Sequence, residues 1–195
     1  PYIDYAAARS GDPRLEFRVG DATALALPDG AIDRCFSLLA LNFMAAPARA
    51  LAELRRVTRP GGTVAAAVWD FSGGLVYQRI FWDTAAALDP DASRARARQL
   101  SLPLTRAGEL EAAFVEARLK DVVAATLTIR QAFQDFADYW QPIRTAQGPV
   151  GDYVKRLPPD RLASLEAALR DAYCAGAEDG PRSLVAVSYT HLRAH

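Results

Sequence analysis

The sequence predicts an α/β fold, because two strand-like segments enclose a helical one between residues 32 and 69. Residues 35–41 and 63–69 are apolar runs without polar alternation, which is typical of strands buried on both faces of a parallel sheet. Between them, residues 48–58 carry apolar side chains at helical spacing. A strand, a helix and a strand in this order predict a right-handed crossover unit.

The residues around this unit support the same pattern. Pro60 ends the helix, and Gly61 and Gly62 allow the chain to turn back into the sheet. Toward the N-terminus, residues 2–9 have helical character. Residues 15–19 alternate with period two, which predicts a short strand near a sheet edge.

After residue 69 the chain again alternates between helical and strand-like segments, with one long helical excursion before the last strand. We expect, in order, an aromatic helix at 77–88, a polar and mobile segment at 90–98, a helix from Thr105 that buries Leu110, Phe114 and Val115, a strand at 122–129, the excursion at 133–173 and a last strand at 183–187.

The composition is that of a globular domain with one sizeable core. The chain has 195 residues, of which 51% are apolar, and 23 basic residues balance 23 acidic ones. This balance provides no net field that would attract nucleic acid or a membrane surface. No apolar stretch approaches the roughly 20 residues of a membrane span. Cys35 and Cys174 are far apart and are expected to be free thiols, which predicts a cytoplasmic protein.

Several enzyme classes are disfavoured by the residues that are missing. Both histidines, His191 and His195, lie at the C-terminus, so the body of the chain offers no Ser-His-Asp or Cys-His constellation. The two cysteines and two histidines do not have the spacing of a zinc site. A phosphate-binding loop with a lysine is also missing. These absences disfavour the triad hydrolases, the Cys-His enzymes, a zinc site and nucleoside triphosphate hydrolysis.

Three motifs carry a resemblance to a known family. They are Val19-Gly20-Asp21-Ala22, the loop and acidic residue at 27–33, and the helix and turn at 51–62. In this order and spacing they resemble the class I S-adenosylmethionine-dependent methyltransferases, in the branch with the type 11 methyltransferase domain. The resemblance runs through residues 1–130 and extends to the last strand. It implies a Rossmann-like sheet, S-adenosyl-L-methionine as cofactor and a small-molecule methyl acceptor.

The resemblance also implies a cofactor site. Asp21 would accept a hydrogen bond from the adenine amino group, the Ala22 backbone N–H would reach a ring nitrogen, and Leu38 would line the pocket. An aspartate that only caps a turn is the alternative for Asp21, and a plain core leucine is the alternative for Leu38. Methyl transfer requires an in-line approach of the acceptor, so positioning and desolvation supply most of the catalysis. No catalytic acid or base is assigned.

The acceptor site is expected where the strands end, because ligands of open α/β sheets bind outside the carboxyl ends of the strands. Asn42 and Phe43 follow the first buried strand, and Trp69 ends the second. Trp140 lies in the excursion at 133–173, which we expect to cover the acceptor. The alternatives are that Asn42 only ends its strand and that Trp140 packs in a core or anchors a dimer.

The chain departs from the family pattern at both ends. No Gly-x-Gly-x-x-Gly element and no acidic strand-two end precede the first motif, so we expect strands one and two of the order 3-2-1-4-5-7-6 to be missing and the fragment to be inactive. Residues 1–187 would be a single partial methyltransferase domain. Residues 188–195 resemble translated adaptor sequence, and a natural basic tail is the alternative.

The sequence leaves two alternatives to methyl transfer. One is an inactive remnant or interaction module that keeps the shape without the cofactor. The other is an NAD(P)-dependent oxidoreductase, which shares the alternation of strands and helices. The missing dinucleotide fingerprint and the motif at 19–22 disfavour the oxidoreductase.

Overall fold

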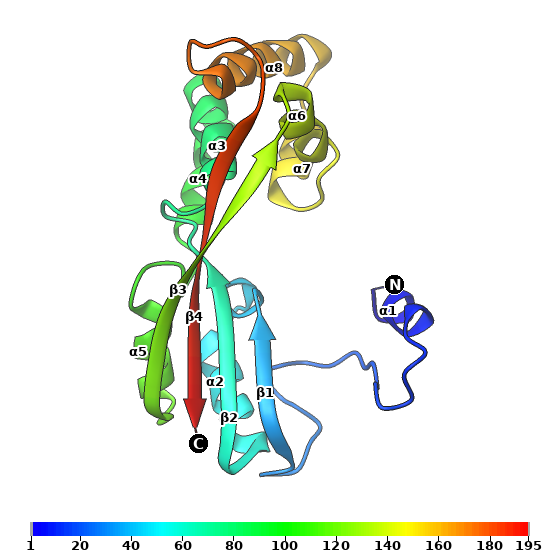
Figure 1. Cartoon of the computed structure of the whole chain (residues 1–195), viewed down its shortest axis with the longest axis vertical. Coiled ribbons are helices and arrows are strands. Elements are labelled where there is room, and N and C mark those ends of the chain that lie inside the picture. Colours follow the sequence, from blue (N-terminus) through cyan, green and yellow to red (C-terminus); the bar gives the residue numbers. More distant parts are fainter. Residues whose placement is uncertain (1, 195) are drawn as a thin grey trace.

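The structure is a computed structural model that describes residues 2–194, with the side chains of residues 2–190. Its centre is a four-stranded sheet in the order β1-β2-β4-β3 (Figure 1). Strands β1 (Ile32–Leu38) and β2 (Thr58–Trp69) are parallel, whereas β4 (Arg182–Ala194) runs antiparallel to both β2 and β3 (Lys120–Phe133). The predicted α/β fold with flanking helices is confirmed.

Helix α2 (Pro47–Val57) provides the crossover between β1 and β2. It begins after the short 3-10 helix η1 (Leu41–Phe43), and it packs apolar side chains against the sheet. After the helix, near the start of β2, Gly61 has a φ of +76°, a conformation that favours glycine. A Cβ on Gly62 would lie 2.7 Å from the backbone oxygen of Asp33. The two glycines are therefore needed to bring β2 close to β1.

Two apolar cores lie at opposite ends of the molecule. The sheet core packs α2 and α5 (Glu109–Glu116) against one face of the sheet. The helical core joins α3 (Val76–Leu88), α6 (Phe136–Arg144), α7 (Pro149–Val154) and α8 (Pro159–Cys174). Strands β3 and β4 are long enough to run from one end to the other (Figure 1). The helices between them are the excursion that the sequence predicts.

The sheet face opposite α2 and α5 presents apolar side chains to solvent. We call it the open face and define it by Phe36 and Leu38 of β1 with Val123 and Leu127 of β3, which are 53–76% exposed. The register places Phe36, Leu38 and Val123 in cross-strand rows with alanines of β2, and it places Leu127 in a row with Trp69. Both edge strands of the sheet, β1 and β3, therefore expose large apolar side chains on this face.

The structure corrects the prediction of a strand at 15–19. No strand forms there, and Leu15 and Val19 are 56% and 88% exposed. An alternating pattern specifies a strand only where a neighbouring strand satisfies its backbone groups, and this segment has no such neighbour. It forms part of the extended connection between α1 (Tyr2–Arg9) and the sheet (Figure 1).

The segment predicted to be polar and mobile at 90–98 is instead helix α4 (Pro90–Leu100). Asp89 caps this helix by accepting a hydrogen bond from the Asp91 backbone N–H at 2.9 Å, and Pro90 occupies the first turn. Alanine, arginine and glutamine are also good helix formers. A high charge content was therefore the wrong reason to expect disorder.

Two further boundaries differ from the prediction. Helix α5 begins at Glu109 rather than Thr105, and Val115 is 58% exposed, whereas Leu110 and Phe114 are fully buried as predicted. The last strand runs beyond Val187 to Ala194, pairing residues 188–194 with β2. Ser188 donates its hydroxyl to the Val68 carbonyl at 2.9 Å. The origin of residues 188–195 stays a prediction, and His195 lies outside the described residues.

Candidate functional site

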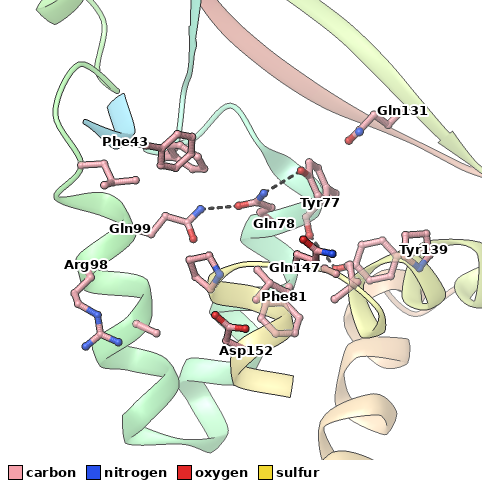
Figure 2. A pocket seen from close by; sticks show the side chains of 18 of the residues that line it. Phe43, Tyr77, Gln78, Phe81, Arg98, Gln99, Gln131, Tyr139, Gln147 and Asp152 are labelled. Carbon is pink, nitrogen blue, oxygen red and sulfur yellow. Dashed lines mark hydrogen bonds between the residues drawn. The ribbon is translucent and has the colours of Figure 1, made fainter. Parts of the chain in front are cut away.

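A cavity of about 810 Å³ lies beyond the carboxyl ends of the parallel strands (Figure 2). Phe43, at the end of η1, and Phe71, two residues after the end of β2, meet edge to face in its wall, with 5.8 Å between their ring centroids. Helices α3, α4, α6 and α7 and strand β3 supply the rest of the wall. The position is the one expected for a ligand in an open α/β sheet, and the volume suits a drug-sized molecule.

A chain of hydrogen bonds runs along one wall of the cavity. The Gln99 amide nitrogen donates to the Gln78 amide oxygen at 2.6 Å, and the Gln78 nitrogen donates to the Tyr77 hydroxyl at 2.9 Å (Figure 2). Because the Tyr77 oxygen accepts this bond, its own hydrogen remains available to a ligand. The chain joins α3 to α4 and fixes the orientation of both glutamines.

Tyr139 contributes a second phenol to the wall. Its hydroxyl donates to the Tyr77 backbone carbonyl at 2.9 Å, which ties α6 to α3. Burial raises the pKa of Tyr139 far above its ordinary value. The phenol therefore stays protonated at neutral pH and serves to hold the wall in place rather than to accept a proton.

Gln131 of β3 also lines the cavity. In Figure 2 its amide group points toward Tyr77. The side-chain oxygen of Gln131 is buried and makes no hydrogen bond to the described residues. A buried oxygen without a donor is uncommon in folded proteins, so this atom calls for an explanation. Gln147, by contrast, accepts a hydrogen bond from the Tyr2 hydroxyl of α1 at 2.8 Å.

The charged residues of the wall are confined to the rim. They are Arg98 of α4, Asp152 of α7 and Arg156, and all three are exposed. The Arg156 guanidinium donates to the Asp152 backbone carbonyl at 2.8 Å. The interior of the cavity is therefore formed by aromatic rings, aliphatic side chains and amides.

The first motif, Val19-Gly20-Asp21-Ala22, lies near the start of α2, where Ala22 packs against the sheet core. One carboxylate oxygen of Asp21, Oδ1, accepts hydrogen bonds from both the backbone N–H and the hydroxyl of Thr23 at 2.8 Å, and these bonds lower the pKa of Asp21. Arg49 in the first turns of α2 donates to the Thr23 carbonyl at 3.0 Å. Asp21 therefore caps a turn, as the alternative interpretation predicts. Both bonds use Oδ1, which leaves Oδ2 open to a donor.

The other predicted site residues have different environments. Leu38 is 76% exposed at the end of β1, and Ala22 packs partly against the sheet core. Asn42 is fully buried, and neither amide atom has a hydrogen-bond partner among the described residues. Trp69 packs partly buried beside Phe71.

Of the predicted acceptor residues, Phe43 is the one that lines the cavity. Trp140 is 1% exposed inside the helical core and stacks on Phe136, with 6.4 Å between the ring centroids. Sequence reasoning did not single out Gln78, Gln99 or Gln131. No sequence signal marks them, because the three glutamines come from different elements and meet only in the folded chain.

The comparisons with known proteins agree with this geometry. Residues 1–66 match the family described as a methyltransferase domain. This match covers less than half of the chain. In fold, 98% of the chain superposes on 75% of a putative methyltransferase from Bacillus halodurans, with a TM-score of 0.56 and 14% sequence identity. The described strands follow the 4-5-7-6 part of the expected methyltransferase order.

Two curated methyltransferases align with short segments of the chain. The malonyl-[acyl-carrier protein] O-methyltransferase of Serratia marcescens is 44% identical over 57 residues, which are 29% of this chain and 22% of that protein. The demethylmenaquinone methyltransferase of Renibacterium salmoninarum is 42% identical over 55 residues, which are 28% and 23%. The matched segments thus span less than a quarter of each relative's length.

Proposed function

We propose that this chain takes part in S-adenosylmethionine-dependent methyl transfer to a small-molecule acceptor. The observation that carries the proposal is the large cavity at the carboxyl ends of β1 and β2, next to a segment that matches the methyltransferase family. The two curated relatives methylate different compounds according to their names, so they support methyl transfer without defining the acceptor.

Asp21 and Leu38 each keep a group that the cofactor could contact, although Leu38 lies on the open face and Ala22 packs against the sheet core on the α2 face. Asp21 offers an open carboxylate oxygen, and Leu38 offers an exposed apolar surface at the end of β1. We assign Asp21, Ala22 and Leu38 to the adenosine part of S-adenosylmethionine. The bound cofactor would supply an electrophilic methyl group on a sulfonium. The protein's own contribution is to orient the acceptor and to exclude water from the reacting groups.

The acceptor belongs in the cavity in this proposal. Phe43 and Phe71 form its wall on the sheet side, and α6 and α7 cover it from the excursion. The excursion then acts as a substrate cap. Asn42 lies next to Phe43 and stays a predicted acceptor contact, while Trp140 supports the cap from within the helical core.

Replacing Asp21 tests the cofactor assignment. We expect Asp21→Ala to weaken S-adenosylmethionine binding about tenfold, because a charged acceptor of a hydrogen bond is lost. Asp33→Ala is the matched control. Asp33 lies near the start of β1, at the other end of that strand from the cavity, and pairs with Arg59 at 2.5 Å. Equilibrium dialysis with labelled cofactor measures both variants. An unchanged affinity in Asp21→Ala, or an equal loss in both, would show that Asp21 only caps its turn.

The open face favours a second candidate function, that of an interaction module. A module of this kind would keep the shape of the methyltransferase without binding the cofactor. Saturable cofactor binding by the wild type and by the Asp33→Ala control in the same dialysis experiment would exclude the module.

A further inference from the structure

The cavity wall contains a hydrogen-bond acceptor that has no donor among the described residues. It is the buried side-chain oxygen of Gln131, a residue that lines the cavity (Figure 2). Leaving such an oxygen without a partner is costly, so a ligand that supplies a donor gains affinity there. The opposite wall adds the Tyr77 hydroxyl, whose hydrogen is free because its oxygen accepts from Gln78.

The charge distribution of the wall limits what can enter. Arg98, Asp152 and Arg156 are all exposed at the rim, where solvent weakens their interactions. Among the described residues that line the cavity, Arg98, Asp152 and Arg156 are the charged ones, so its interior offers no described counter-charge for an ionised group. An ionised ligand group placed beside Gln131 would lose its hydration without gaining a counter-charge, which is strongly unfavourable.

From these two features we infer that the cavity takes an uncharged, largely apolar acceptor that carries a hydroxyl or N–H group and donates it to Gln131. This inference rests on the proposed function and deepens it by naming the class of acceptor. The aromatic rings of Phe43, Phe71 and Tyr77 suit a flat hydrocarbon body. The hydrogen-bonded glutamines of α3 and α4 hold the opposite wall in one arrangement before the ligand enters.

Four compounds with one naphthalene body test the inference by calorimetry without S-adenosylmethionine. They are 2-naphthol, 2-methoxynaphthalene, 2-naphthoate and 2-naphthylmethylammonium. We expect the wild-type chain to bind 2-naphthol several-fold more tightly than the other three. Gln131→Leu should weaken 2-naphthol binding about tenfold, because the acceptor is lost. The same variant should leave 2-methoxynaphthalene unchanged, since that compound has no donor, and this also shows that the cavity is intact.

Gln141→Leu is the matched control, because Gln141 is an exposed residue of α6 that does not line the cavity. It should bind all four compounds as the wild type does. Compounds bound to the open face instead would be insensitive to Gln131→Leu.

Three results would overturn the inference. They are tighter binding of 2-naphthoate or 2-naphthylmethylammonium than of 2-naphthol, an equal effect of Gln131→Leu on 2-naphthol and 2-methoxynaphthalene, and no measurable binding of 2-naphthol. None of these results would contradict the proposed cofactor binding or methyl transfer, because the experiment contains no S-adenosylmethionine. A failed Asp21 test, in turn, leaves the preference for a neutral donor in place.

Discussion

At the scale of single residues, Glu53 and Arg56 of α2 hold the N-terminal loop on the sheet. Glu53 accepts a hydrogen bond from the Leu25 backbone N–H at 2.8 Å, and Arg56 donates to the carbonyls of Leu25 and Leu27 at 3.0 and 2.8 Å. The two side chains also pair with each other at 2.8 Å. The loop that carries Asp21 is therefore positioned by α2, which itself follows the end of β1.

This arrangement predicts an acid-sensitive contribution to stability. The bonds from Arg56 and Leu25 lower the pKa of Glu53 to about 2. Because this folded-state pKa is below the ordinary value, the stabilisation is complete above the ordinary pKa and is lost as the pH falls toward about 2. We expect Glu53→Gln to lower the melting temperature near neutral pH and to reduce its further decline between about pH 5 and about pH 2.

Thermal unfolding followed by circular dichroism over this pH range measures the effect. Glu116→Gln is the control, because Glu116 is exposed on α5. The Glu53 interpretation is wrong if the two variants and the wild type lose melting temperature in parallel as the pH falls.

At the scale of elements, Asp89 connects helices α4, α7 and α8. It caps α4 at the Asp91 backbone N–H, accepts a hydrogen bond from Tyr153 of α7 at 2.9 Å and pairs with Arg161 of α8 at 3.1 Å. Burial and this bond raise the pKa of Tyr153 to about 12, so the phenol remains a donor at neutral pH. The cavity wall formed by α4 and α7 depends on this junction.

We expect Asp89→Ala to lower the free energy of unfolding by about 2–4 kcal/mol, since it removes a helix cap and leaves a buried phenol without its acceptor. Tyr153→Phe should cost about 1 kcal/mol, because one hydrogen bond is lost without leaving an unpaired donor. Urea titration measures both variants. Asp91→Ala, at an exposed position in the first turn of α4, is the comparison. An Asp89→Ala loss no larger than that of Asp91→Ala would contradict the junction.

At the scale of the whole molecule, the two sheet faces differ in kind. One face is covered by α2 and α5, while the open face exposes Leu38 and Leu127 among other apolar side chains. Exposed apolar surface favours association between molecules.

Among the described residues, no helix is both long enough and apolar enough to cross a membrane.

Threonine substitutions on the open face should therefore improve solubility. We expect Val123→Thr with Leu127→Thr to raise the concentration at which the protein stays monomeric by several-fold, because threonine keeps the strand propensity while it reduces apolar surface. Light scattering against concentration measures this. Val64→Thr, which alters a fully buried position of β2, should instead destabilise the fold. No gain in solubility from the double variant would mean that association does not involve the open face.

The sequence by itself determined the α/β class, the crossover unit and the methyltransferase motifs. These are encoded locally, because a continuous apolar run, a helical stripe and a Pro-Gly-Gly turn restrict the backbone wherever they occur. The buried positions of Leu110 and Phe114 were predictable for the same reason.

The cavity was decided only by the tertiary structure. Gln78, Gln99 and Gln131 look like ordinary polar residues along the chain, and they acquire meaning because α3, α4 and β3 meet at one place. The same holds for Trp140, whose burial depends on Phe136 and the other rings that surround it in the helical core. The strand expected at 15–19 was wrong because strand formation requires a partner strand, and partners are supplied by the whole fold rather than by the segment.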